Sequence, residues 1–403
     1  MTVDMQSDEA EVWFRRRGLP LVVHGSAQGR ALIARTVPAL VFLDALALVS
    51  FLVTLIPESD PDDPIADAPW GYTDMGVADQ ILTTLTVLIA LLVGAATVLG
   101  LPTLAAWMTQ KALRGRSSTV QLVAGVVVGA LSVVGLPVIG MTDLASYWAG
   151  AAEASVAVVL VLVLVRLGVG AIMIWAIRTA ARQISGIAAM ASRVLPLLLL
   201  VVMFAFFTGE LWQAVNALSR AQLWVAVTFL AVLAAGFLTT SITDELPALR
   251  AASRARADLQ ARLQDTPLAG TTTPAEHTPL SRPEQFNVAL VLFLAQAVQV
   301  VAFVVVVFAF FIVFGVLMIT PGVQEIYLAA APPGEATFFG IAVPVSNALF
   351  QISLFLAAFS GLYFTASKTT DERYRRAFFE PLIDEIALSL AARDVYHERW
   401  PRG

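Results

Sequence analysis

An apolar run from Arg193 to Leu218 is long enough to cross a lipid bilayer and contains a single carboxylate, Glu210. Because hydrocarbon offers no partner for a charge, a carboxylate at that depth costs roughly 2.5–3.5 kcal/mol or more. It therefore needs a proton, water or a side chain of opposite charge. Seven further apolar runs complete a predicted all-α bundle of eight transmembrane helices. These runs cover approximately residues 36–57, 79–110, 118–141, 154–178, 221–243, 286–319 and 345–367.

The composition supports a chain that lies mostly in lipid. Hydrophobic residues make up 58% of the 403 residues and charged residues only 14%, against about a quarter charged in soluble proteins. There is no cysteine, which excludes disulfides, thiolate catalysis and cysteine metal sites. The three histidines lie outside the apolar runs, so we expect neither a metal site nor a cofactor. The first run is too long for a cleaved signal peptide and should remain as an anchor.

Three polar regions flank or divide the spans. Residues 1–35 place Trp13 and Phe14 beside three arginines, which predicts either a helix at the headgroup surface or a solvated basic stretch. Residues 244–285 read as a helix followed by a loop rich in Pro and Thr, between spans six and seven. Residues 368–403 form an amphipathic tail after span eight. Its apolar side consists of Phe378, Phe379, Leu382, Ile383 and Ile386.

The distribution of basic residues predicts the orientation. With eight spans and both termini in the cytoplasm, 23 of the 25 Lys and Arg residues fall in cytoplasmic segments. The other two are Arg166, inside span four, and Arg220, on an outer turn. The loop at 58–79, with seven carboxylates and no basic residue, then faces outward.

Three charges inside the spans are the leading functional candidates: Asp44 in span one, Arg166 in span four and Glu210 in span five. Arg166 lies between the two carboxylates in depth and could pair with either. Titratable groups inside spans mark proton or ion pathways, which is the functional interpretation. The alternative is a static ion pair or a hydrogen-bonded carboxylate that holds helices together, and it is favoured for Asp44, which lies nearer an interface.

Four amides in the last two spans are lesser candidates for the wall of a polar path. Gln296 and Gln299 share one helix face because they are three residues apart, and Asn347 and Gln351 share another because they are four apart. Hydrogen bonds between helices are the commoner role for such amides.

No enzyme motif is present: the chain lacks a P-loop, GxSxG, HExxH and the Rossmann glycine pattern, and nothing supports nucleic-acid binding. The leading hypothesis is therefore a non-enzymatic transport protein for a small solute, ion or lipid. The alternative is a scaffold or assembly subunit of a cell-envelope complex, docking through residues 244–283 and 372–403. Membrane lipids are expected partners, and a homo-oligomer is left open.

Two stretches resemble a family of uncharacterised integral membrane proteins from actinobacteria. They are RVLPLLLLVVMFAFFTGELWQ at 193–213 and LAAFSGLYFTASKTTDERYRRAFFEPL at 356–382, with weaker similarity around 287–314. The high Ala, Val, Leu and Arg content fits such a source. The resemblance implies a multi-pass protein of the plasma membrane and carries no catalytic residue across.

Overall fold

The protein is described from a computed structural model. The structure describes residues 2–23, 32–55, 77–139, 141–182, 200–255, 263–264, 266–269, 279–330, 334–338, 341–368 and 380–400.

Seven helices in these ranges are long and apolar enough to cross a membrane. All described secondary structure is helical apart from one antiparallel hairpin of two short strands, β1 (Glu335–Phe338) and β2 (Ile341–Ser346). The long helices are α3 (Leu32–Thr54), α4 (Val77–Leu113), α5 with α6 (Ser118–Ala130 and Leu136–Ile139, joined by a π-helical turn at Leu131–Gly135), α7 (Leu144–Arg166), α11 (Arg220–Ala255), α13 (Arg282–Met318) and α15 (Asn347–Lys368).

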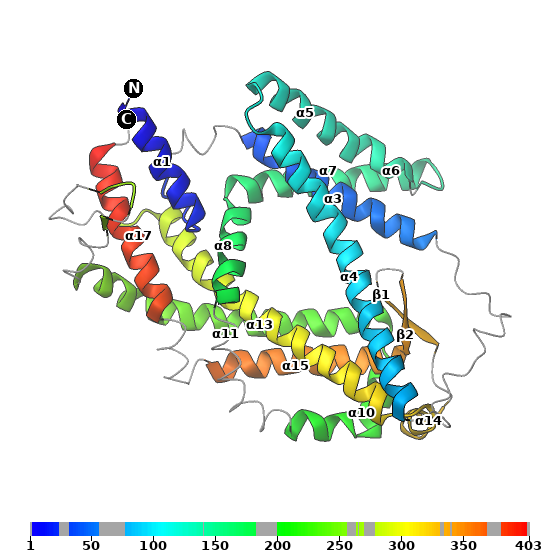
Figure 1. The fold of residues 1–403 in the computed structure, drawn as a ribbon. Coiled ribbons are helices and arrows are strands. Elements are labelled where there is room, and N and C mark those ends of the chain that lie inside the picture. The colour runs from blue at the N-terminus through cyan, green and yellow to red at the C-terminus, as the bar shows by residue number, and fades with distance from the viewer. Residues whose placement is uncertain are drawn as a thin grey trace.

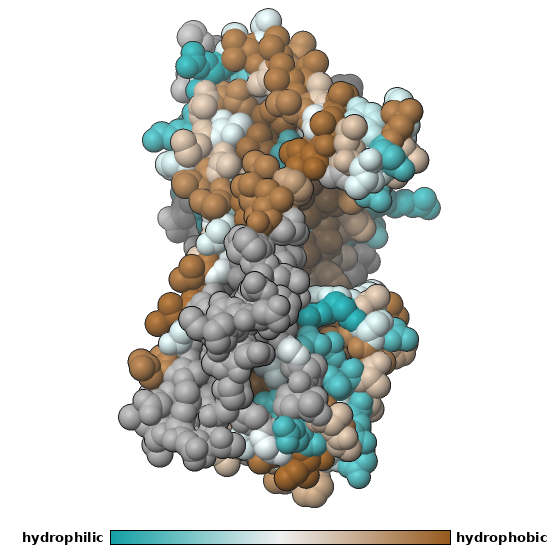
Figure 2. Space-filling view, turned by 90° about the vertical axis from the view of Figure 1, so that its right-hand side faces the viewer, coloured by the Kyte–Doolittle hydropathy of each residue, from teal (hydrophilic) through white to brown (hydrophobic). Residues whose placement is uncertain are grey.

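The helices α4, α5 with α6, and α7 pack around α3; in Figure 1 α5, α6 and α7 lie at the upper right, and α4 runs from there to the lower right. A Cβ on Gly125 of α5 would meet Ile33, near the start of α3, so α3 and α5 run in the same direction. The end of α7 lies beside the start of α3, where Arg35 contacts the carbonyl of Val165, so α7 runs the opposite way. Apolar side chains gather over the upper part of the face in Figure 2, and the exposed apolar residues of α5, such as Val126 and Val127, suit contact with lipid.

A second group of helices is built on α13 and α15, which pack antiparallel. Phe303 stacks on Phe364 with ring centroids 4.3 Å apart, and Gly315 lies against Leu349. Around them pack α11, a helical turn at 200–206, α10 (Gly209–Asn216), α14 (Pro321–Leu328) and the hairpin. At 37 residues, α13 is about 55 Å long, far longer than a hydrocarbon core of about 30 Å, so one end projects beyond the lipid.

The helices nearest the two termini meet at one end of α13. The N-terminal helix α1 (Thr2–Arg16) and the C-terminal helix α17 (Glu380–Arg399) lie side by side on the left of Figure 1. Phe14 and Tyr396, both fully buried, are in edge contact at 5.5 Å. They share an apolar cluster with α8 (Val169–Arg182), with Leu263 and Leu268, and with the first turns of α13.

This cluster changes the picture of the two terminal segments. The tail is amphipathic as predicted, but Leu382, Ile383 and Ile386 are buried within the chain, and Phe378 and Phe379 lie outside the described residues. The N-terminal helix is likewise a packed element and does not merely lie on a surface, because one side of it contacts α17 and α8.

Two predicted spans are wrong in their bounds. Span four was placed at 154–178, whereas α7 begins at Leu144 because Asp143 caps it, accepting a 2.7 Å hydrogen bond from the Ser146 N–H. That hydrogen bond also lowers the pKa of the exposed Asp143 carboxyl. The helix ends at Arg166, and α8 starts after a turn at Gly168, whose φ is +72°.

Span five, placed at 193–218, is interrupted. Residues 200–206 are helical, Phe207 and Thr208 are not, and α10 begins at Gly209. Residues 193–199 lie outside the described part. The tight turn predicted near Ser219 is present, since α11 starts at Arg220, and α11 continues without interruption through the end of span six to Ala255.

Spans seven and eight are confirmed to within a few residues. Between them lie the short helix α14 and the hairpin of β1 and β2, and the hairpin was not predicted from the sequence. Val345, expected to open span eight, belongs to β2, and α15 starts at Asn347 because the Ser346 hydroxyl accepts a hydrogen bond from the Leu349 N–H at 3.2 Å.

Candidate functional site

Of the three predicted charges, Asp44 is the one that lies in the middle of a long helix. It is twelve residues after Leu32 and ten before Thr54 in α3. The sequence had placed it nearer an interface, whereas the apolar stretch of this helix, Arg35–Leu52, has Asp44 near its centre. The carboxyl group is partly buried, and its Oδ2 accepts a 2.9 Å hydrogen bond from the buried hydroxyl of Ser132.

Ser132 belongs to the π-helical turn at Leu131–Gly135. Pro137 follows this turn, and a proline inside a helix removes one hydrogen bond while its ring crowds the carbonyl four residues earlier. A locally wider turn relieves that crowding, and such turns are frequent at functional sites. On its other side, Pro137 packs against Gly150 of α7, so three helices meet around this segment.

The Ser132 hydroxyl has two acceptors within reach. Besides Asp44, it lies 3.0 Å from the carbonyl oxygen of Val128, one turn earlier in the same helix. A serine hydroxyl has one proton to donate and two lone pairs to accept with. It can therefore donate to an ionised Asp44, or accept a hydrogen bond from the O–H of a neutral Asp44 while donating to the Val128 carbonyl. Both charge states of the carboxyl group keep a complete hydrogen bond.

Arg166 is not in the middle of a span. It is the last residue of α7, and its side chain is exposed. Gly168 ends the helix with a φ of +72°, and a Cβ there would meet the ring of Pro20, so contact with the segment after α1 selects glycine. Within the described residues no ion pair joins Arg166 to Asp44.

The earlier start of α7 instead places Glu153 within a candidate span, nine residues after Leu144. Because Arg35 of α3 contacts Val165 of the antiparallel α7, Glu153 lies roughly one turn from the level of Asp44. Its side chain is exposed. The Asp143–Ser146 capping pattern was the sequence signal that could have revealed it.

Glu210 lies in the first turn of α10, just after the break at Thr208, and its side chain is exposed. A carboxylate there is favoured by the unpaired N–H groups of the helix start. The polar side chains that follow it in α10, Trp212 and Gln213, make hydrogen bonds to other parts of the chain. The Trp212 ring N–H donates to the Phe206 carbonyl at 2.7 Å, and the Gln213 amide donates to the Tyr327 carbonyl at 2.9 Å.

The four amides form two pairs at different levels of α13 and α15. Gln296 and Gln299 are buried on α13, on the side of Phe303 and Phe364 that lies toward the end of α15. Asn347 lies at the start of α15, where its Oδ1 accepts a 2.8 Å hydrogen bond from Arg220. Because the helices are antiparallel, the two pairs are about 20 Å apart.

Gln351 is buried one turn after Asn347, and no hydrogen bond to its Oε1 is found among the described residues. None of the three predicted charges meets another in the described part of the chain.

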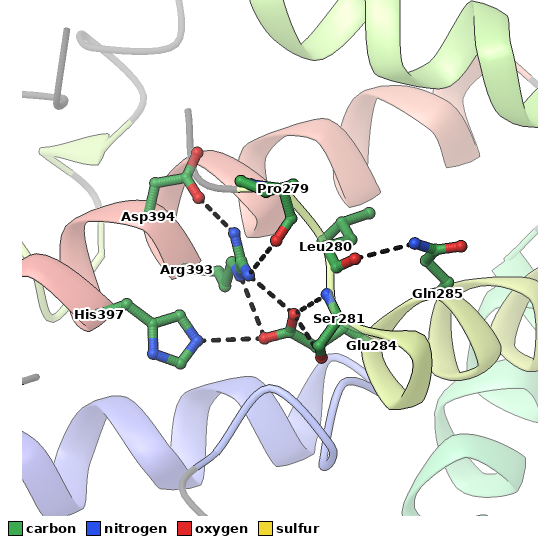
Figure 3. A network of polar contacts seen from close by, with 8 residues as sticks. All are labelled: Pro279, Leu280, Ser281, Glu284, Gln285, Arg393, Asp394 and His397. Carbon is green, nitrogen blue, oxygen red and sulfur yellow. Dashed lines mark hydrogen bonds and ion pairs between the residues drawn. The ribbon is translucent and has the colours of Figure 1, made fainter. Parts of the chain in front are cut away.

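A buried ionic network that sequence reasoning missed lies where α13 meets α17 (Figure 3). Glu284, with 0% of its side chain exposed, accepts hydrogen bonds from Arg393 Nη2 at 2.7 Å and Nε at 3.2 Å. His397 Nε2 lies 3.1 Å from Glu284 Oε1, and the Ser281 backbone N–H and hydroxyl donate to Oε2 at 2.8 Å each. Asp394 pairs with Arg393 at 2.7 Å.

Electrostatics hold Arg393 in its charged form. Burial alone would lower the pKa of Arg393, but hydrogen bonds and charge from Glu284, and then from Asp394, raise it. A raised pKa means that the stabilising contribution is complete below the pKa of the unfolded chain and is lost only as the pH rises through the still higher folded pKa. Arg393 therefore stays charged, and keeps its ion pairs, over the physiological pH range.

Two sequence signals pointed to this network. Ser281 and Glu284 form a capping box at the start of α13, and Arg393 and His397 share one face of the tail helix. Neither signal says that the two ends of the chain meet. No group of three His, Asp or Glu residues in the described ranges is placed to hold a metal ion.

No known protein family matches the chain, and neither does any curated protein or solved structure.

Proposed function

We propose that this protein is a multi-pass membrane transport protein in which Asp44 is the proton-binding residue of an ion- or proton-coupled pathway. The observation that carries the proposal is the switchable hydrogen bond of Ser132, which can serve either Asp44 or the Val128 carbonyl. A carboxyl group inside a membrane usually changes charge only at a high cost. Here both charge states have a partner, so protonation and release require no rearrangement of the helices.

The same proposal replaces the three-charge arrangement expected from the sequence. Arg166 and Glu210 lie at helix ends with exposed side chains, so neither is assigned to the pathway. Glu153 is exposed near the level of Asp44 and is the second carboxyl group that such a pathway could use.

The topology that goes with this function has eight crossings. The contact between α1 and α17 supports this proposal, because two ends of a chain that lie on the same side of a membrane go with an even number of crossings. Seven crossings are the long helices. For the eighth we retain the predicted span five, residues 193–218, because the described chain before and after it lies at two levels of α13: Trp175 of α8 lies beside Gly18 near Val291, whereas Phe206 stacks on Phe311. Val291 and Phe311 are about 30 Å apart along α13, the thickness of a hydrocarbon core.

We further propose that both termini lie in the cytoplasm and that the membrane is the plasma membrane. With Arg166 at the end of α7 that adjoins the start of α3, Arg220 is the one basic residue assigned to the outer side. The basic residues are then even more one-sided than the sequence indicated, as the positive-inside rule requires. The plasma membrane follows from the resemblance to the actinobacterial family.

Proton flux in proteoliposomes tests the function. Purified full-length protein is reconstituted, a pH gradient is imposed with potassium and valinomycin clamping the voltage, and a trapped pH-sensitive dye reports its decay. We expect the wild-type protein to speed the decay over empty liposomes, and Asp44→Asn to remove at least nine-tenths of that increase. Glu210→Gln is the matched control and should retain the flux. Equal decay with wild-type and Asp44→Asn protein would overturn the assignment.

The alternative, a non-transporting assembly subunit, relied partly on the tail as a docking surface. The apolar residues of α17 are buried inside the chain, so that face is not free for a partner. Most of the 244–283 region lies outside the described residues or has no described side chains. No observation therefore favours this alternative over transport.

A further inference from the structure

The π-helical turn at Leu131–Gly135 separates two contacts that α5 and α6 make with different helices. Before and within the turn, the close approach of Gly125 to Ile33 and the hydrogen bond from Ser132 to Asp44 both face α3. Gly125 and Ser132 are seven residues apart, which is close to two full turns, so they lie on one face of the helix. This part of the helix is therefore fixed against α3.

After the turn, Pro137 packs against α7. A Cβ on Gly150 would lie 3.3 Å from the Pro137 Cβ and 3.7 Å from its Cα, and the first distance is shorter than the usual contact between two carbon atoms. The missing side chain of Gly150 therefore lets the two helices approach. The π-helical turn itself also contacts α7, so the segment that follows Ser132 is fixed against a second helix.

The extra residue of the π-helical turn makes the two contacts compatible. In a regular α-helix, Pro137 would be rotated by roughly 140° from Ser132, because five residues at 3.6 per turn exceed one turn by that angle. A turn closed by an i→i+5 hydrogen bond takes up one more residue, which reduces the rotation to roughly 40°. Ser132 and Pro137 can therefore face the same side of α5 and α6, where α3 and α7 pack against each other.

This turn leaves a backbone carbonyl without its usual helical partner. The Leu136 N–H donates to the Leu131 carbonyl, and Pro137 has no N–H to donate. These are the two groups that would serve the Ser132 carbonyl in an α-helix or a π-helix, so neither is available to it. An unpaired carbonyl at membrane depth is unfavourable, and such a turn persists where the surrounding contacts require it.

We propose that Pro137 and Gly150 are positioning residues, which act through the π-helical turn to hold the Ser132 hydroxyl on Asp44. The inference rests on the proposed function, because it identifies what controls the partner of the same carboxyl group. With Pro137→Ala the segment can return to a regular α-helix, and with Gly150→Val the new side chain pushes α6 away from α7. Either change turns Ser132 away from Asp44 without removing a polar side chain.

Cross-linking reads this geometry without a transport assay. The chain contains no cysteine, so Asp44→Cys/Ser132→Cys introduces the only two thiols. A short bifunctional methanethiosulfonate is added to the full-length protein in detergent, and mass spectrometry of a digest gives the linked fraction. We expect efficient linkage in the otherwise wild-type protein and a several-fold lower yield when Pro137→Ala or Gly150→Val is added.

Two matched controls should leave the cross-linking yield unchanged. Pro102→Ala removes a proline from inside α4, and Gly170→Val adds the same side chain at a glycine of α8 whose Cβ would meet no atom within 4 Å. Equal yields in the wild-type and Pro137→Ala backgrounds would overturn the proposal. If Pro137→Ala prevents folding, Gly150→Val must lower the yield and the Gly170→Val control must not, or the proposal fails.

Proton flux in proteoliposomes connects the geometry to function. Pro137→Ala should lower the flux several-fold, to the level of Ser132→Ala. Adding Ser132→Ala to Pro137→Ala should cause no further loss, because two residues that act through one interaction are not additive. A merely structural effect of Pro137 would instead add to that of Ser132→Ala, and additive losses would overturn the proposal.

The two assays separate failure of this inference from failure of the proposed function. If Asp44→Asn loses the flux while Pro137→Ala keeps it, this inference alone fails. If Asp44→Asn keeps the full flux, the proposed function fails, and the cross-linking yields still decide whether Pro137 and Gly150 position Ser132.

Discussion

Two carboxyl groups, Glu284 and Asp44, are withdrawn from water in different ways. Glu284 is fully buried and is held by an arginine, a histidine and two groups of Ser281. Asp44 is only partly buried, and its partner in the described part of the chain is one hydroxyl group. The first is surrounded by fixed positive charge and by donors, whereas the second faces a group that can donate or accept.

The difference separates a structural charge from an exchangeable one. Removing the charge of Glu284 would take away the carboxylate that lies 2.7 Å from the buried Arg393, so the network opposes protonation. Adding a proton to Asp44 only reverses the direction of one hydrogen bond. Burial alone does not predict this contrast, since the more deeply buried carboxylate is the one that stays charged.

The largest expected effect follows from breaking the network at Arg393. Arg393→Leu leaves Glu284 as an uncompensated buried charge and should destabilise the protein by about 3–5 kcal/mol. The apparent midpoint of thermal unfolding in detergent measures this loss. Adding Glu284→Gln to the same protein should recover a substantial part of it. A single variant as stable as wild type would contradict the structural role of the network.

A smaller loss is expected at His397, whose ring lies 3.1 Å from Glu284. His397→Ala removes one hydrogen bond to a charged acceptor, which is worth about 1.5–3 kcal/mol. The neighbouring Glu398 is exposed, so Glu398→Ala is the matched control and should change stability by less than about 0.5 kcal/mol. Equal unfolding midpoints for the two variants would remove His397 from the network.

Ser132→Ala tests the other carboxyl group. Hydrogen bonds between membrane helices contribute about 0.6 kcal/mol on average, so the unfolding midpoint should fall only slightly. Proton flux should fall by several-fold, because neutral and ionised Asp44 lose their common partner. A variant with lower stability but full flux would show that the hydroxyl serves only helix packing.

The smallest change in stability is expected for Asp44→Asn, within about 0.5 kcal/mol of wild type, because the amide keeps the shape of the side chain and can still bond Ser132. The same variant should lose nearly all proton flux. A loss of several kcal/mol would instead place Asp44 beside Glu284 as a structural charge.

Individual residues show where sequence reasoning ends. Asp44 was chosen from the sequence as a candidate nearer an interface, whereas the apolar stretch of α3, Arg35–Leu52, has Asp44 near its centre. Arg166 was misplaced because the apolar pattern continues through Gly168, and only the contact with Pro20 explains the break. Glu153 fell just before the predicted start of span four at residue 154. Because α7 begins ten residues earlier, at Leu144, Glu153 lies inside the helix.

The sequence by itself determined the class of protein, because the cost of placing polar groups in lipid is a local property of about 20 consecutive residues. It also determined the long apolar helices and the one-sided distribution of basic charge. The tertiary structure decided which charges meet. Glu284 and Arg393 are 109 positions apart, and Asp44 and Ser132 are 88 apart. Such pairs depend on where each helix ends and which face packs inward, and contacts across the whole chain select both.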